Sequence, residues 1–204
     1  MSESRVHVTL LRHGRSQADD ERIHEGHYDS PLTEVGRSQA HARARDFAAR
    51  GLRFDRVVAS TLQRAQETAA IVGAALGVAV ESDADWQEMN SGLLAGLPFD
   101  EAARRYPQPD FRNPYEPYVV SGESDWEVYC RAARAVEKVV RRGGSTLVVA
   151  HGGILNAALR GIAGAGPWVN RQGLAFGFGD TGYARLVYAP ARDSWVLFEF
   201  APEG

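Results

Sequence analysis

Short apolar runs alternate along this chain with stretches in which apolar residues recur at helical spacing. Residues 6–11, 57–59 and 146–150 are rich in β-branched and aliphatic side chains, which predicts buried strands, and a further short strand is expected near 78–81. Helices are predicted between these runs, over about 33–50, 61–76, 123–142 and 153–162. This alternation is typical of an α/β fold with a mostly parallel central sheet.

Polar residues mark where several of these helices begin and end. Thr33 is suited to cap the helix that runs to about Arg50, and Ser60 with Gln63 three residues later forms a plausible capping box. Gly77 is expected to end the helix over 61–76. The apolar face of the helix over 123–142 is predicted to consist of Trp126, Tyr129, Ala133, Val136 and Val140.

The remaining segments complete one domain spanning residues 1–204. Residues 183–188 and 195–200 are predicted to pair as a hairpin. Residues 97–123 are rich in proline and aromatic residues, which indicates an irregular insertion or lid with a short helix near 99–106. With 204 residues, of which 44% are hydrophobic, the chain is long enough to bury one sizeable core.

Charge and cysteine content exclude several classes of protein. The net charge of −3 argues against a general nucleic-acid or membrane surface, because such surfaces carry a basic excess. No apolar run is long enough to span a bilayer, no apolar signal region precedes the first strand, and the single Cys130 has no partner for an internal disulfide. We therefore expect a cytoplasmic protein without nucleic-acid or membrane partners, and the sequence leaves both a monomer and a homodimer open.

Candidate chemistry lies where the predicted strands end. Arg12, His13 and Gly14 follow the first strand, and His151 and Gly152 follow the strand over 146–150. The carboxyl ends of parallel strands meet at one edge of a sheet, where ligands bind, so the two histidines are expected to converge.

A third element of this cluster comes from Arg64, in the first turn of the helix after strand 57–59. The helix dipole disfavours a cation there unless the arginine and the helix end face the same anion. Two arginines and two histidines at one point repel each other unless a multivalent anion fills the site, and phosphate is the obvious candidate.

At this point the chain resembles the histidine phosphatase superfamily, which includes cofactor-dependent phosphoglycerate mutases and many small-molecule phosphatases. Six motifs in the right order, covering nearly the whole chain, carry the resemblance: Leu11-Arg12-His13-Gly14, Asp29-Ser30-Pro31-Leu32-Thr33 with Gly36, Ser60-Thr61-Leu62-Gln63-Arg64-Ala65, Glu88-Met89 with Gly92 and Gly96, Ser121-Gly122-Glu123-Ser124 and Ala150-His151-Gly152-Gly153. The resemblance implies a three-layer α/β/α sandwich of the phosphoglycerate mutase-like type.

The resemblance also implies a role for each residue of the cluster. His13 would attack phosphorus and form a phosphohistidine, and Arg12, Arg64 and His151 would hold the non-bridging oxygens. Glu88 would protonate the leaving alkoxide, and it is selected from several nearby carboxylates by its spacing to Gly92 and Gly96. The implied substrate-binding residues are Arg12, Gly14, Ser16, Asp19, Gly26, Arg64, His151 and Gly152.

Neither a metal nor a cofactor is expected at this site. The cationic side chains replace a metal, and His24-Glu25-Gly26-His27, which looks at first like a metal site, lacks the helical spacing of one and is interpreted as the rim of the pocket. The expected partners are a small phosphorylated metabolite as substrate and inorganic phosphate as product.

Departures from the family pattern bear on the function. Asp19 stands where the family has a phosphate-binding Asn, so a carboxylate there needs a partner, for which Arg15 or Arg22 is a candidate. Ser91 replaces the tyrosine usual in mutases, and the segment 98–120 is short, which favours a phosphatase, a phosphoric monoester hydrolase similar to histidine acid phosphatases.

Two alternative functions stay open from the sequence. The run over 92–97 echoes the mutase form, so a cofactor-dependent phosphoglycerate mutase is the enzymatic alternative. The aspartate at position 19 invites a further alternative of another class, a catalytically weak sensor that binds a phosphorylated ligand.

Overall fold

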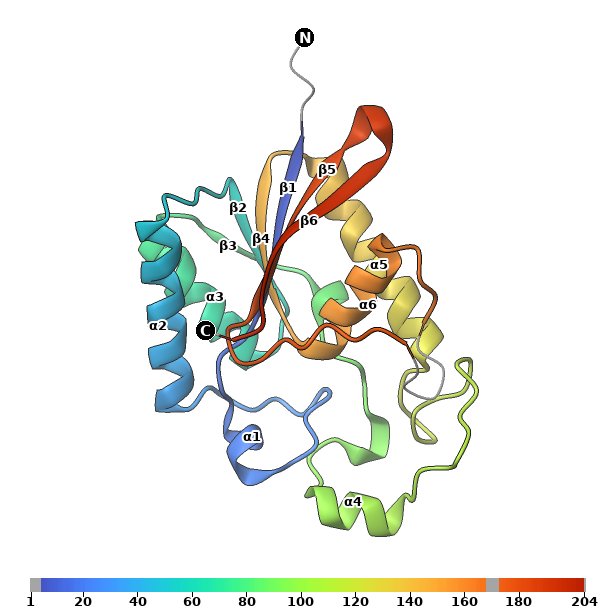
Figure 1. Cartoon of the computed structure of the whole chain (residues 1–204). Helices are drawn as coiled ribbons and strands as arrows, with labels where there is room; N and C mark the ends of the chain where they lie inside the picture. The colour runs from blue at the N-terminus through green and yellow to red at the C-terminus, as the bar shows by residue number, and fades with distance from the viewer. Residues whose placement is uncertain (1–4, 168–172, 204) are drawn as a thin grey trace.

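A six-stranded, mostly parallel sheet forms the centre of the protein (Figure 1), whose computed structural model describes residues 5–167 and 173–203. The strand order is β3-β2-β4-β1-β5-β6. The first four strands in this order run parallel to one another, whereas β5 pairs antiparallel with β1 on one side and with β6 on the other. The strands are β1 (Val6–Arg12), β2 (Arg56–Ala59), β3 (Val80–Ser82), β4 (Ser145–Ala150), β5 (Tyr183–Ala189) and β6 (Ser194–Ala201).

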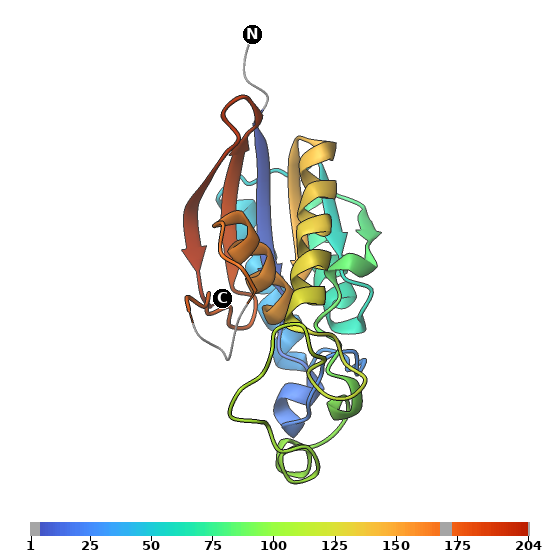
Figure 2. The ribbon, with the colours of Figure 1, turned by 90° about the vertical axis from the view of Figure 1, so that its right-hand side faces the viewer.

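Helices cover both faces of this sheet. Figures 1 and 2 show α2 and α3 on one face and α5 and α6 on the other, while α1 and α4 lie beyond the carboxyl ends of the parallel strands. Their bounds are α1 (Gln17–Glu21), α2 (Glu34–Ala49), α3 (Gln63–Leu76), α4 (Phe99–Arg105), α5 (Asp125–Arg142) and α6 (Gly152–Ile162). The predicted three-layer α/β/α sandwich is confirmed.

Alternating side chains of the central strands build a core on each face of the sheet. Leu10 and Val148 belong to the cluster under α5 and α6, whereas the neighbouring Leu11 and Val149 belong to the cluster under α2 and α3. All four side chains are fully buried. This two-sided burial explains why the strands are continuous apolar runs rather than alternating ones.

The ends of the helices partly follow the sequence prediction. Thr33 caps α2 by accepting a hydrogen bond from the Gly36 N–H at 3.0 Å, and Gly77 ends α3 in the left-handed conformation. The capping box at Ser60 is wrong: α3 begins at Gln63 with Leu62 as its N-cap residue and no side-chain cap. The Ser60 hydroxyl instead faces His151, at 2.8 Å.

The predicted apolar face of α5 is displaced by about one position. The side chains buried against the core are Val128, Ala132, Ala135 and Val139, whereas Trp126 is 41% exposed. Trp126 stacks on Tyr129 at the helix surface, with ring centroids 6.0 Å apart. Two adjacent stripes of this helix are apolar, and the stripe with the alanines faces the core because it allows closer approach to the sheet.

The predicted insertion over 97–123 lies beyond the carboxyl ends of the parallel strands (Figure 2), and its short helix is α4. Its first residues are hydrogen-bonded to the loop that follows β1: the His24 N–H donates to the Leu97 carbonyl at 2.9 Å, and the Phe99 N–H donates to the Arg22 carbonyl at 3.0 Å. The two segments that enclose the edge of the sheet therefore hold each other in place.

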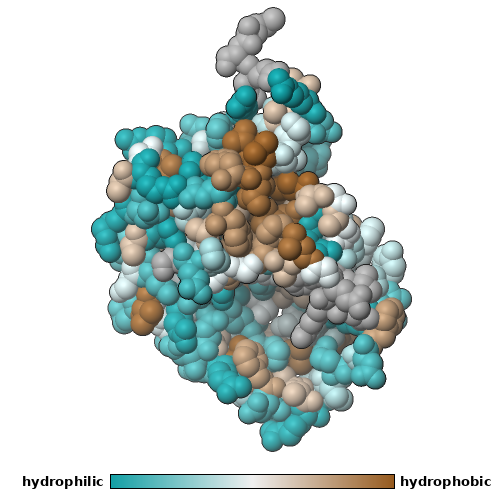
Figure 3. Space-filling model, viewed as in Figure 1, coloured by the Kyte–Doolittle hydropathy of each residue, from teal (hydrophilic) through white to brown (hydrophobic). Residues whose placement is uncertain are grey.

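The edge strand β6 carries an apolar surface patch (Figure 3), to which the exposed Val196, Leu197 and Phe198 contribute. The predicted hairpin is confirmed as β5 and β6, joined by a short 3-10 turn over Pro190–Arg192. Within residues 5–167 and 173–203, we find no helix with the length and apolar character that a membrane span requires.

Candidate active site

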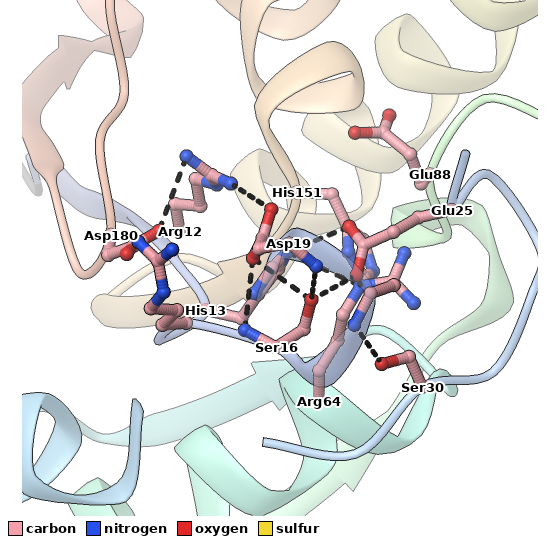
Figure 4. Close-up of polar contacts among 12 residues, drawn as sticks. Arg12, His13, Ser16, Asp19, Glu25, Ser30, Arg64, Glu88, His151 and Asp180 are labelled. Atoms are coloured by element: carbon pink, nitrogen blue, oxygen red, sulfur yellow. Dashed lines mark hydrogen bonds and ion pairs between the residues drawn. The ribbon is translucent and has the colours of Figure 1, made fainter. Parts of the chain in front are cut away.

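Three neighbouring parallel strands deliver the predicted cluster to one point. His13 follows β1, Arg64 lies in the first turn of α3 just after β2, and His151 is the N-cap residue of α6 directly after β4. Their exposed fractions are 1%, 0% and 0%, respectively. Figure 4 shows these side chains, together with Arg12, gathered beyond the sheet edge, as the sequence predicts.

The imidazole of His13 is held in one tautomer. Its Nδ1 lies 2.7 Å from the Gly14 carbonyl oxygen, and a carbonyl only accepts, so Nδ1 carries the proton and Nε2 the lone pair. Burial, followed by the charges of Arg64 and Arg12, holds the pKa of His13 well below its usual value of 6.5. A neutral ring whose Nε2 carries a lone pair rather than a proton is the form that can act as a nucleophile.

Arg64 is a fully buried cation that is tied to the loop after β1. It donates from Nη1 to the Tyr28 carbonyl and from Nη2 to the Gly26 carbonyl, each at 3.0 Å. Its Nε lies 3.3 Å from Nε2 of His13. The guanidinium therefore positions the loop and at the same time faces the reactive nitrogen of His13.

His151 completes the buried part of the cluster. Its ring centroid is 5.0 Å from that of His13, and its Nε2 lies 2.8 Å from the Ser60 hydroxyl. Its Nδ1 is buried and has no hydrogen-bond partner within the described part of the chain. Burial and then the charge of Arg64 hold the pKa of His151 well below 6.5, so this ring is also neutral.

Arg12 lies at the open side of the cluster and faces two carboxylates. Its side chain is 21% exposed and forms ion pairs of 3.6 Å with Asp19 and with Asp180. The partner of Asp19 is therefore Arg12, and the expected partners Arg15 and Arg22 are wrong, because Arg15 pairs with Asp20. No motif or pattern in the sequence pointed to Asp180, which comes from a segment without a recognised motif.

The predicted binding residues of the first loop have clear structural roles. Gly14 passes so close to the backbone of Gly36 that a Cβ would collide with the Gly36 carbonyl oxygen. Ser16 caps α1 and reaches Asp19 through its hydroxyl, while Gly26 adopts a positive φ of 49° and presents its carbonyl to Arg64. Gly152 is the first residue of α6, next to His151.

Glu25 lies inside the cluster rather than at its rim, which corrects the sequence interpretation. One carboxylate oxygen lies 3.3 Å from Nε of Arg64 and accepts a hydrogen bond of 2.5 Å from the Ser16 hydroxyl. The other lies 3.9 Å from Nε2 of His13. Its position directly before Gly26, in the loop after the His13 motif, was the available signal.

Glu88 makes a different set of contacts from the other predicted catalytic residues. Its carboxylate accepts hydrogen bonds from the N–H groups of Gly153 at 2.9 Å, Ile154 at 3.1 Å and Met89 at 2.8 Å. In Figure 4 this carboxylate lies apart from the dashed network of the cluster. Glu88 thus anchors the first turn of α6, the helix that follows His151.

Asp85 is one of the carboxylates near Glu88 in the sequence that could also have been the proton donor, but it is held by other charges. Arg134 and Lys138 bind its carboxylate, and the hydrogen bond from Arg134 is the main reason why the pKa of Asp85 lies well below its usual range. A carboxylate that stays ionised in this way is a poor proton donor near neutral pH.

Comparison with known proteins identifies relatives of this chain. The model of the histidine phosphatase superfamily (branch 1) matches residues 8–199. The 2,3-bisphosphoglycerate-dependent phosphoglycerate mutase of Methylobacterium sp. (strain 4-46) is 34% identical over 167 residues, which are 77% of this chain and 80% of that protein. The probable phosphoglycerate mutase GpmB of Yersinia enterocolitica is 30% identical, covering 82% of this chain and 79% of that protein.

Several solved structures have a fold similar to that of this chain. YhfR of Bacillus stearothermophilus superposes with a TM-score of 0.82 at 25% identity, covering 97% of each chain. A mycobacterial glucosyl-3-phosphoglycerate phosphatase in complex with inorganic phosphate superposes with a TM-score of 0.76 at 25% identity, covering 96% of this chain and 97% of that one.

Proposed function

The chain belongs to the histidine phosphatase superfamily, and on this premise we propose that it hydrolyses small-molecule phosphomonoesters through a phosphohistidine intermediate. The single observation that carries the proposal is the state of His13: buried and neutral, with its Nδ1 proton donated to Gly14 and its Nε2 lone pair next to the guanidinium of Arg64. This is the arrangement that a nitrogen nucleophile attacking a phosphate held by arginine requires.

The reaction then proceeds in two displacements. Arg12, Arg64 and His151 bind the non-bridging oxygens, Nε2 of His13 forms a bond to phosphorus, and the bond between phosphorus and the ester oxygen breaks. The leaving alkoxide takes a proton from Glu88. A water molecule next gives a proton back to the Glu88 carboxylate and attacks the phosphohistidine, which breaks the phosphorus–nitrogen bond and releases inorganic phosphate.

Glu88 is the proton donor in this proposal, as the resemblance implies. Its carboxylate is fixed by three backbone N–H groups, two of which belong to the helix that follows His151. A carboxylate held in this way has one definite position. Its Oε1 accepts two of these hydrogen bonds and its Oε2 accepts one, so Oε2 retains a lone pair for a proton. The charge of the two guanidinium groups serves in place of a metal ion, so we expect activity without added metal or cofactor.

The names of the relatives support a second candidate function. The two curated relatives described above carry the name phosphoglycerate mutase, whereas one structural neighbour is a glucosyl-3-phosphoglycerate phosphatase. Ser91 and the short 98–120 segment favour the phosphatase. We therefore retain the cofactor-dependent mutase as the alternative.

Two assays separate these functions. Turnover of p-nitrophenyl phosphate in the presence of EDTA is expected for the phosphatase, and a protein that binds phosphate without turnover would instead be a sensor. Conversion of 3-phosphoglycerate to 2-phosphoglycerate with catalytic 2,3-bisphosphoglycerate, faster than phosphate release, would identify the mutase. A screen of phosphorylated metabolites would then define the substrate, because specificity depends on the loops that surround the cluster.

A further inference from the structure

The position of Glu25 conflicts with the binding of a phosphate dianion. Its carboxylate lies 3.3 Å from Arg64 and 3.9 Å from Nε2 of His13, the two groups that a phosphoryl group has to reach. A dianion bound there would come into contact with a negatively charged carboxylate in a partly buried site, where like charges repel strongly.

The other charges of the site do not remove this conflict. Arg12 is the second cation, but Asp19 and Asp180 each form an ion pair with it. His13 is neutral at ordinary pH and adds no positive charge. With Glu25 ionised, the site therefore contains three carboxylates, Glu25, Asp19 and Asp180, and two cations, Arg12 and Arg64, before any ligand enters.

We propose that Glu25 is a further catalytic residue, which binds the phosphoryl group as a carboxylic acid and donates a hydrogen bond to one of its non-bridging oxygens. This inference rests on the proposed phosphatase function and deepens it. A protonated carboxyl group has an O–H donor, so the group that repels the dianion as a carboxylate becomes part of its binding site as an acid. The two forms of the site differ only in the protonation state of Glu25.

The surroundings of Glu25 raise its pKa and so make protonation easier than for an exposed carboxylate. Burial is the main cause that raises the pKa of Glu25 above its usual value, and Asp19 on α1 raises it further. Arg64 on α3, the Ser16 hydroxyl at the start of α1 and Arg12 at the end of β1 act in the opposite direction. A bound dianion adds a negative charge to this environment and raises the pKa of Glu25 again.

Proton uptake then accompanies binding of the dianion. Above the pKa of free Glu25, each dianion that binds takes about one proton from solvent, and the proton returns to solvent when the ligand leaves. The affinity consequently falls about tenfold for each pH unit above that pKa, and it does not depend on this group below it.

Sulfate is a suitable probe because it remains a dianion from about pH 5 to pH 8, whereas phosphate itself titrates in this range. Isothermal titration calorimetry with sulfate, in buffers of different ionisation enthalpy, measures both the affinity and the number of protons taken up. Glu25→Gln keeps the shape of the side chain and a hydrogen-bond donor but has no proton to gain. Asp19→Asn is the matched control, since it removes the other carboxylate of the same loop.

We expect wild-type protein to lose affinity for sulfate as pH rises and to take up about one proton per sulfate at the alkaline end. Glu25→Gln should bind sulfate with an affinity that varies less than about twofold over the same range, without proton uptake. Asp19→Asn should bind sulfate more tightly but retain the proton uptake of the wild type. Infrared spectroscopy of the wild type should show a protonated carboxyl band that appears when sulfate binds, which tests the proposal without any variant.

Equal proton uptake by wild type and Glu25→Gln, or no new carboxyl band in the wild type, would overturn the role of Glu25. Turnover of p-nitrophenyl phosphate tests the phosphatase function separately. A protein that is active but binds sulfate without linked protons rejects only the Glu25 proposal, and a protein that binds sulfate with linked protons but has no turnover rejects only the phosphatase. Failure of the wild type to bind sulfate at every pH rejects the Glu25 proposal, and turnover of p-nitrophenyl phosphate alone then decides the phosphatase function.

Discussion

Nε of Arg64 lies 3.3 Å from Nε2 of His13, and both side chains are buried. The guanidinium that faces the reactive nitrogen also disfavours its protonation, and burial acts in the same direction. One residue pair therefore combines two requirements of the proposed reaction, a neutral nucleophile and a cation at the position of the transferred phosphoryl group.

The first prediction concerns the nucleophile. Because Nε2 of His13 is the atom that forms the bond to phosphorus, His13→Ala should abolish turnover. Rapid quenching of wild-type protein with labelled substrate should trap phosphate on the protein that is labile to acid and stable to base. Circular dichroism of the variant provides the control for folding, and an active His13→Ala protein would disprove the assignment.

The second prediction concerns pH and stability. His13 and His151 are buried and neutral, and the pKa of each is lowered, so below pH 6.5 the unfolded chain binds more protons than the folded one. Stability should therefore fall as pH decreases, by about 1.4 kcal/mol per pH unit for each histidine, until the folded-state pKa is reached.

Urea unfolding of His151→Gln at pH 5, 6 and 7.5 should show a shallower loss of stability than that of the wild type. His41→Gln replaces an exposed histidine on α2 and should leave the slope unchanged. If His151→Gln lost as much stability per pH unit as the wild type, this would contradict the neutral buried state of His151.

The third prediction compares the two arginines. Arg12→Ala and Arg64→Ala each remove charge-assisted hydrogen bonds to the transition state and should lower kcat/KM by about 10²-fold or more. Arg64→Ala should also destabilise the fold by about 1–3 kcal/mol, because it leaves the carbonyls of Gly26 and Tyr28 without their donor.

Arg12 is more exposed and donates to a single backbone carbonyl, that of Phe178. The free energy of unfolding of Arg12→Ala should therefore be close to that of the wild type. Steady-state kinetics and urea unfolding of both variants measure the two effects. Equal losses of stability would refute this distinction between the arginines.

The fourth prediction tests Glu88 as the proton donor. A general acid matters most when the leaving alkoxide is poor, so Glu88→Gln should slow hydrolysis of an alkyl phosphate far more than that of p-nitrophenyl phosphate. Gly153→Ala offers an independent variant, because a Cβ on Gly153 would press against the Glu88 carboxylate and displace it.

His13→Ala is the control for the fourth prediction and should impair both substrates alike. If Glu88→Gln lowers both rates equally, Glu88 acts only as the anchor of α6. The proton donor would then have to be another carboxylate, and Asp85 is disfavoured because Arg134 and Lys138 keep it ionised.

The sequence by itself determined the layers of the fold and the convergence of the cluster. Buried parallel strands appear as short apolar runs, and their carboxyl ends meet at one edge, so the positions of His13, Arg64 and His151 followed from where the runs over 6–11, 57–59 and 146–150 stop. This inference works because regular backbone hydrogen bonding fixes the residue at the end of each strand.

Only the tertiary structure decided which carboxylates enter the cluster and how α5 is rotated. The loop that carries Glu25 is held by hydrogen bonds to Leu97 and Phe99, and Asp180 reaches Arg12 from a segment far along the chain. Such loop positions depend on contacts between distant segments, which leave no periodic pattern in the sequence. For α5, two stripes satisfied the same periodicity, and only packing against the sheet selected the one with Ala132 and Ala135, because small side chains allow the closest approach.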